Sequence, residues 1–112
     1  MHSDDLLAYN ALLSSKGISL VSLGAEEKAL ERESALLATR LLESALVPIL
    51  GGDVYFQRGQ KIVPAYANWH CERLREECDE VYARRCGSMS RSYIERFPTR
   101  TEDAPIFVLV TG

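Results

Sequence analysis

The sequence predicts one helix-rich α+β domain that covers residues 1–112. Three observations predict this class: apolar residues at helical spacing in the middle of the chain, a short β-branched run at 18–23, and an unbroken apolar run at 105–110. The length suits a single domain, and an apolar share of 46% is ordinary for a folded one. No internal repeat or linker divides the chain.

The first helix is expected over about residues 3–16. Asp4 and Asp5 place negative charge at its first turn, where the helix dipole is positive, and Gly17 is a natural stop. The next residues, 18–23, read Ile-Ser-Leu-Val-Ser-Leu, which favours a strand or an extended connector.

The longest helix is predicted for about residues 25–46. Its first half is charged, and its second half is apolar on two adjacent faces, so we expect it to be the central helix of the core. Pro48 and the Gly51–Gly52 pair should end it.

A hairpin is predicted next, over 53–63, with its turn at Arg58-Gly59. Pro64 can open a helix over about 65–85, because apolar residues recur there at steps of four and three: Ala67, Cys71, Leu74, Cys78 and Val81.

Gly87 should break that helix, and a second short helix should run over 88–97 and stop at Pro98. The run at 105–110 is apolar at every position, so it predicts a strand that is covered on both faces.

Without the first helix the predicted order is β-α-β-β-α-β, the order of a split βαβ, ferredoxin-like sheet. We therefore expect a small sheet packed on the long central helix. The alternative is a mostly helical domain with loops at 18–23 and 53–63. Its helix–loop–long helix over residues 3–50 resembles a histone-fold subunit in the lengths of its elements.

Composition excludes some classes of partner. The net charge of −3 argues against a nonspecific nucleic-acid or membrane-surface binder. No apolar run approaches the ~20 residues that span a bilayer. Three cysteines are an odd number at low density, so we expect a reducing intracellular compartment, either cytoplasm or organelle matrix.

Two cysteines are expected in the core rather than at a site. On one helix, Cys71 and Cys78 would lie about 10.5 Å apart along the axis, too far for a disulfide. No C-x-x-C pair or histidine at ligand spacing points to zinc, and we expect no metal and no cofactor.

Cys86 has the strongest chemical surroundings, because Arg84 and Arg85 would lower the pKa of its thiol. The loop Cys86-Gly87-Ser88-Met89-Ser90-Arg91 resembles the active loop of rhodanese-type sulfurtransferases, whose backbone amides hold an anion above a helix N-terminus. The resemblance implies that Cys86 carries the persulfide and that Arg91 clamps the anion. A Cys86-dependent sulfurtransferase or phosphatase-like enzyme is therefore the alternative function.

The function that we favour is a non-enzymatic protein-binding module or a small accessory subunit of an intracellular complex, because no complete catalytic set is present. A small acidic immunity-type inhibitor of a basic toxin belongs to this class. The partner would be another protein or a second copy of the chain.

The last strand could extend a partner's sheet as an edge strand. Aromatic and arginine residues concentrate over 66–97, and such residues are typical of interface hot spots, although the core is the favoured location for the aromatic ones. The predicted partner-binding residues are Tyr66, Trp69, Arg73, Arg84, Arg85 and Tyr93.

Overall fold

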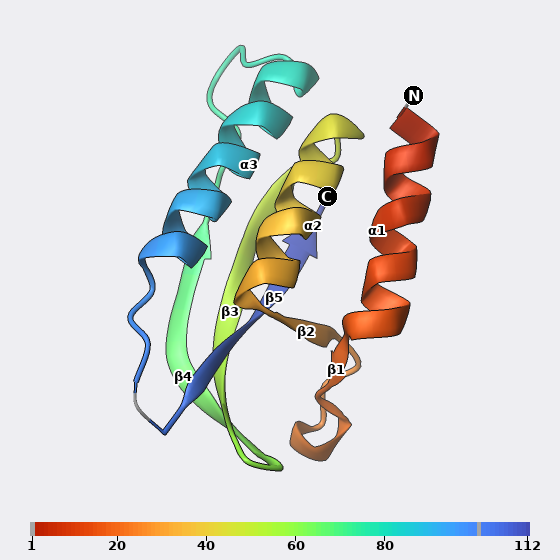
Figure 1. Ribbon diagram of the computed structural model, residues 1–112. Coiled ribbons are helices and arrows are strands. Elements are labelled where there is room, and N and C mark those ends of the chain that lie inside the picture. The colour runs from red at the N-terminus through yellow and green to blue at the C-terminus, as the bar shows by residue number, and fades with distance from the viewer. Residues whose placement is uncertain (1, 101) are drawn as a thin grey trace.

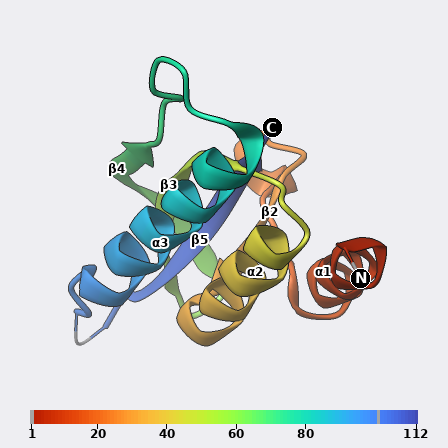
Figure 2. The same ribbon diagram turned by 90° about the horizontal axis from the view of Figure 1, so that it is seen from above.

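The computed structural model describes residues 2–100 and 102–112 and confirms the α+β class. A five-stranded sheet carries a layer of helices on one face (Figures 1 and 2). In chain order the elements are α1 (His2–Lys16), β1 (Ile18–Ser19), a 3-10 turn η1 (Val21–Leu23), β2 (Lys28–Glu31), α2 (Arg32–Ser44), β3 (Ile49–Arg58), β4 (Lys61–His70), α3 (Asp79–Arg96) and β5 (Ala104–Thr111).

The sheet has the strand order β1–β2–β5–β3–β4, and every neighbouring pair is antiparallel. Helix α2 connects β2 to β3 across β5, and α3 connects β4 to β5 across β3. Two split βαβ units are therefore present, with the second strand of each unit at the centre of the sheet. Their first strand, β2, and second helix, α3, do not occupy the predicted ranges 18–23 and 65–85. The mostly helical, histone-fold-like alternative is wrong, because residues 53–63 lie in two paired strands.

The helices lie side by side on one face of the sheet, in the order α1, α2, α3 (Figure 2). Between them and the sheet lies the main core, built around Leu30, Val54, Trp69, Ile94 and Phe107. The opposite face is partly covered by the segment around β1 and η1, where Leu20 packs on Ile106 and Val108. The predicted burial of the last strand on both faces is thus confirmed for residues 106–108.

The β3–β4 hairpin is confirmed and is longer than predicted. Arg58 pairs with Lys61, and Gly59 occupies the turn with a φ of 60°, a conformation that glycine adopts at little cost. The pairing continues to Gly51 opposite His70. The predicted helix over 65–85 is therefore wrong over its first part, and only residues 79–85 are helical, as the start of α3. Its first residues form a strand because ten residues of β3 offer them a partner, and this long-range pairing outweighs the local helical spacing.

The predicted helix over 25–46 is shorter at both ends. Lys28–Glu31 forms β2, in which Ala29 and Leu30 point to opposite faces and both are buried, so this segment gains more as a strand. At the other end α2 stops at Ser44, and Gly51 and Gly52 lie inside β3.

Helix α3 is continuous from Asp79 to Arg96, so the predicted break at Gly87 is wrong. Gly87 is buried inside the helix, where a β-carbon would come within 2.5 Å of the Glu43 carboxylate of α2. The glycine therefore permits close approach of the two helices.

The prediction that the last strand is an edge strand is also wrong. Strand β5 lies between β2 and β3 and pairs with both, so its backbone cannot extend a partner's sheet. The edges of the described sheet are β1 and β4.

Substituting Gly52→Ala should lower the free energy of unfolding by about 3 kcal/mol. The added methyl group would collide with the Trp69 ring and the Val108 carbonyl oxygen, and the carbonyl belongs to a central strand that cannot move aside. Denaturant unfolding monitored by Trp69 fluorescence measures the change. Gly24→Ala is the control, because its methyl group meets open space and only its φ of 78° opposes it, at a cost of about 1 kcal/mol. Equal losses in the two variants would contradict this account.

Candidate functional site

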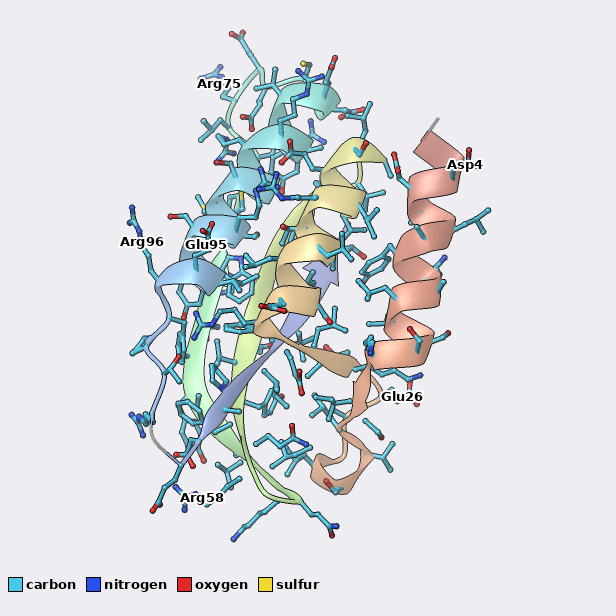
Figure 3. The ribbon with its side chains drawn as sticks, viewed as in Figure 1. Asp4, Glu26, Arg58, Arg75, Glu95 and Arg96 are labelled. Carbon is cyan, nitrogen blue, oxygen red and sulfur yellow. A yellow bond between two sulfur atoms is a disulfide. The ribbon has the colours of Figure 1, made fainter. Side chains whose placement is uncertain are left out.

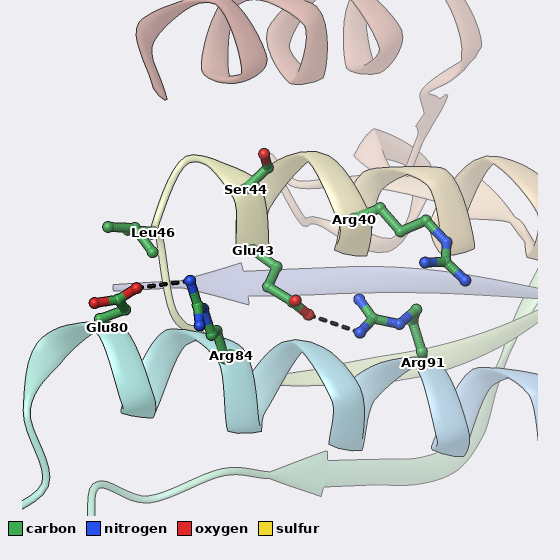
Figure 4. Close-up of a pocket in the computed structure, with 7 residues that line it drawn as sticks. All are labelled: Arg40, Glu43, Ser44, Leu46, Glu80, Arg84 and Arg91. Carbon is green, nitrogen blue, oxygen red and sulfur yellow. Dashed lines mark hydrogen bonds and ion pairs between the residues drawn. The ribbon is translucent and has the colours of Figure 1, made fainter. Parts of the chain in front are cut away.

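A charged groove of about 680 Å³ runs between α2 and α3 on the face of the molecule away from the sheet (Figure 4). We call it the α2–α3 groove. It is lined by Arg40, Glu43, Ser44, Leu46, Glu80, Arg84 and Arg91.

The contribution of α3 to this groove follows from helical spacing. Residues 80, 84, 87 and 91 recur at steps of four, three and four, so they share one side of the helix, and that side faces α2. Gly87 has no side chain, and this leaves the space that the Glu43 carboxylate occupies.

Glu43 also connects the two helices electrostatically. Arg91 Nη2 donates a hydrogen bond to Glu43 Oε1 at 2.7 Å, with the two side chains only 15% and 27% exposed. The other terminal nitrogen, Arg91 Nη1, is buried, and no atom of the described residues accepts a hydrogen bond from it. A guanidinium group offers five N–H donors, and the two on Nη1 are unused in the contacts of the described residues.

The remaining charges of the groove do not balance. Arg84 forms an exposed ion pair with Glu80 at 2.6 Å, one helical turn away. Arg40 is exposed and forms no ion pair or hydrogen bond with the described residues. Three arginines therefore face two glutamates, which leaves one uncompensated positive charge on a protein whose net charge is −3.

The structure separates the predicted partner-binding residues. Arg84 lines the groove. Tyr66 is 92% exposed in β4, where a φ of 56° interrupts the regular strand. Trp69 is buried, donates a hydrogen bond from Nε1 to Ser90 Oγ at 2.9 Å, and stacks on Tyr93 with ring centroids 4.6 Å apart. The core role that we considered for the aromatic residues thus applies to Trp69.

Arg73 and Arg85 belong to a separate cluster around the loop over residues 71–78. Arg85 pairs with Glu77 at 2.7 Å, and Arg73 lies over the Tyr82 ring at 4.5 Å from its centroid. Hydrogen bonds from Arg85 and from the backbone N–H of Leu74 lower the pKa of Glu77 from 4.5 to about 2. These contacts make the loop an ordered part of the fold.

The structure contradicts the loop geometry on which the alternative, enzymatic role of Cys86 was based. Cys86 is fully buried in the middle of α3 and forms a disulfide with Cys71, their Cα atoms 5.6 Å apart. Gly87 to Arg91 are helical, so their backbone amides serve the helix and cannot hold an anion as a rhodanese loop does. Arg91 is directed to Glu43 instead. The anion-cradle reading of 86–91 is wrong because the helix does not break at Gly87.

The other two cysteines differ in their outcomes. Cys71 is buried, as predicted, but it follows β4 and does not share a helix with Cys78, which is exposed just before α3. Among the described residues no three His, Cys, Asp or Glu side chains group as metal ligands. The described helices include none that is both long and apolar enough to cross a membrane.

Sequence reasoning missed Arg40, Glu43 and Glu80. The signal on α3 was available, because 80, 84, 87 and 91 have helical spacing, but the expected break at Gly87 concealed it. On α2 no sequence signal distinguishes Arg40 and Glu43 from ordinary charged surface positions.

Comparison with known proteins gives one match. The model of the family described as Imm40, Immunity protein 40, matches residues 19–111, which include both helices of the groove. No curated protein and no solved structure matches the chain.

Thiol counting tests the Cys71–Cys86 disulfide. Unfolded without reductant, air-oxidised protein should titrate one thiol per chain with a chromogenic disulfide reagent, which is Cys78, and all three after reduction. A Cys78→Ser variant should titrate none before reduction. Three thiols in unfolded, unreduced wild-type protein would contradict the crosslink.

The Arg85–Glu77 pair predicts a defined pH dependence. Because the folded-state pKa of Glu77, about 2, lies below its ordinary value of 4.5, this group stabilises the fold above pH 4.5. That contribution is lost as the pH falls towards 2. The stability difference between wild type and Glu77→Gln should therefore be constant above about pH 4.5 and shrink below it. Urea titrations at stepped pH measure this difference, with Glu76→Gln, an exposed neighbour, as the control.

Proposed function

This chain belongs to the Immunity protein 40 family, and from that premise we propose that it binds a protein toxin and blocks the toxin's activity. The match over residues 19–111 is the observation that carries the proposal. The proposal is a more specific form of the function favoured from the sequence, a non-enzymatic protein-binding module with a protein partner.

We propose the α2–α3 groove as the surface that contacts the toxin. It is charged and open, and apart from Leu46 in the turn after α2 it is formed by two regular helices. Both helices pack on the sheet through the same core, in which Ala35 and Ala38 of α2 and Ile94 of α3 belong to one cluster. A surface held in this way loses little conformational freedom on binding, which favours affinity.

We propose that the protein acts inside the cell, the location expected from its low cysteine content. Neither Cys71 nor Cys86 lines the groove, so toxin binding should not require their disulfide. In a reducing compartment the two would be adjacent buried thiols, and the helices of the groove would keep their packing on the sheet.

Of the six predicted partner-binding residues, only Arg84 lines this groove. Tyr66 is the most exposed of the others, lies in β4 and does not line the groove, so it marks a second, separate surface for comparison.

The test is co-expression of the chain with toxin domains from its source organism, one at a time, in a bacterial growth assay. One toxin should be neutralised by the wild type, as shown by restored growth. The double charge reversal Arg40→Glu with Arg84→Glu should reduce protection at matched expression, because it inverts the charge of the groove. Tyr66→Ala is the control and should protect fully.

Two outcomes would count against the proposal. If no toxin domain is neutralised by the wild type, the toxin-binding function is wrong. If Tyr66→Ala fails to protect and the charge reversal protects, the toxin contacts the sheet rather than the groove.

A further inference from the structure

We infer that the α2–α3 groove binds a carboxylate group of the toxin, an aspartate or glutamate side chain, held between Arg91 and Arg40. This inference rests on the proposed function, because the toxin supplies the carboxylate. It states which chemical group the groove recognises.

The first observation is the incomplete hydrogen bonding of Arg91. Its Nη2 is satisfied by Glu43, while Nη1 is buried and has no acceptor among the described residues. An unsatisfied buried donor is unfavourable, and a carboxylate is the acceptor whose two oxygens fit the planar fork of a guanidinium group. Nη1 is covered in the free protein, so the Arg91 side chain has to turn into the groove, which it already lines, to reach such an acceptor. The contact would then remove a cost that the free protein carries.

The second observation is the free charge of Arg40. Arg40 lies on α2, one turn before Glu43, and lines the groove opposite Arg91 of α3 (Figure 4). It has no ion pair with the described residues, so a ligand need not displace an existing partner to reach it. The two arginines come from facing helices and could contact one group between them.

The charge balance selects a carboxylate over a phosphate. Glu43 and Glu80 also line the groove, and their charges would repel a dianion. The single uncompensated positive charge matches one monovalent carboxylate.

The net charge of the protein gives this site a particular role. With a net charge of −3 the whole molecule attracts a basic partner. This long-range attraction does not determine how the partner is oriented when it binds. A local positive site that accepts one acidic side chain would fix how the toxin is oriented, and it would penalise a partner that lacks the carboxylate.

The variant that tests the site most cleanly is Arg40→Gln. Arg91 also joins the two helices through Glu43, so its loss could disturb the fold, whereas Arg40 is exposed and unpaired. The matched control is Arg75→Gln, an exposed arginine in the loop before α3 that does not line the groove (Figure 3). Arg91→Lys is the second variant, because it keeps the charge and removes the fork; its thermal unfolding should be measured alongside.

The experiment measures the dissociation constant of the toxin identified by co-expression, in catalytically inactive form, by calorimetry. Arg40→Gln should weaken binding on the order of 10-fold, and Arg91→Lys by at least as much, while Arg75→Gln should bind like the wild type. Each Asp and Glu on the toxin surface is then changed to Asn or Gln and tested against both arginine variants. Substitution of one toxin carboxylate should cause a loss of binding free energy that is not additive with the loss caused by Arg40→Gln or Arg91→Lys.

The inference and the proposed function fail in different ways. The wild-type protein could bind the toxin while the effect of every toxin substitution is additive with the effects of both arginine variants. In that case the carboxylate site is wrong and the toxin-binding function stands. If the wild type binds no toxin, the proposed function is wrong. Equal weakening by Arg40→Gln and Arg75→Gln would also overturn the inference, because it would indicate a general charge effect.

Discussion

The indole ring of Trp69 determines how α3 lies on the sheet. On one side the ring lies against Gly52, which has no side chain to keep it away, and on the other it stacks on Tyr93 of α3. Its Nε1–H donates to Ser90 Oγ, so a buried polar pair as well as an aromatic contact sets the rotation of the helix about its axis. Because Ser90 turns toward the sheet, Arg91 and the residues at helical spacing before it turn toward α2.

The close approach of α2 and α3 depends on a second missing side chain. Gly87 in a helix interior costs about 1 kcal/mol of helix propensity relative to alanine. The space it leaves is occupied by the Glu43 side chain, which pairs with Arg91. A partly buried ion pair of this kind is weak evidence for stability, since desolvation opposes the attraction. Its clearer effect is to hold one guanidinium group in place while leaving part of it without an acceptor.

These packing relations separate the two functions that the sequence left open. The enzymatic reading needed a loop with free backbone amides at 86–91, and a continuous helix uses those amides internally. The protein-binding reading needed only a surface, and the same helix supplies one side of it. Membership of an immunity protein family agrees with the second hypothesis, and the α2–α3 groove is the surface that we propose for it.

Some features of this protein were determined by the sequence alone, because they depend on neighbouring residues. The first helix with its acidic start, the hairpin turn at Gly59 and the apolar last strand are all local patterns, and all three are present.

Other features were decided by tertiary structure. Residues 65–70 were predicted as the start of a helix but pair with β3, and residues 28–31 form a strand because β5 lies beside them. Gly87 reads as a helix stop in isolation, yet it is an interior residue because Glu43 of another helix occupies its empty side. Cys71 and Cys86 meet for the same reason, since the strand and helix that carry them are placed together by the sheet. The groove also depends on tertiary structure, because its residues come mainly from two helices whose separation and rotation are set by packing. Packing between distant segments cannot be predicted from a local sequence pattern.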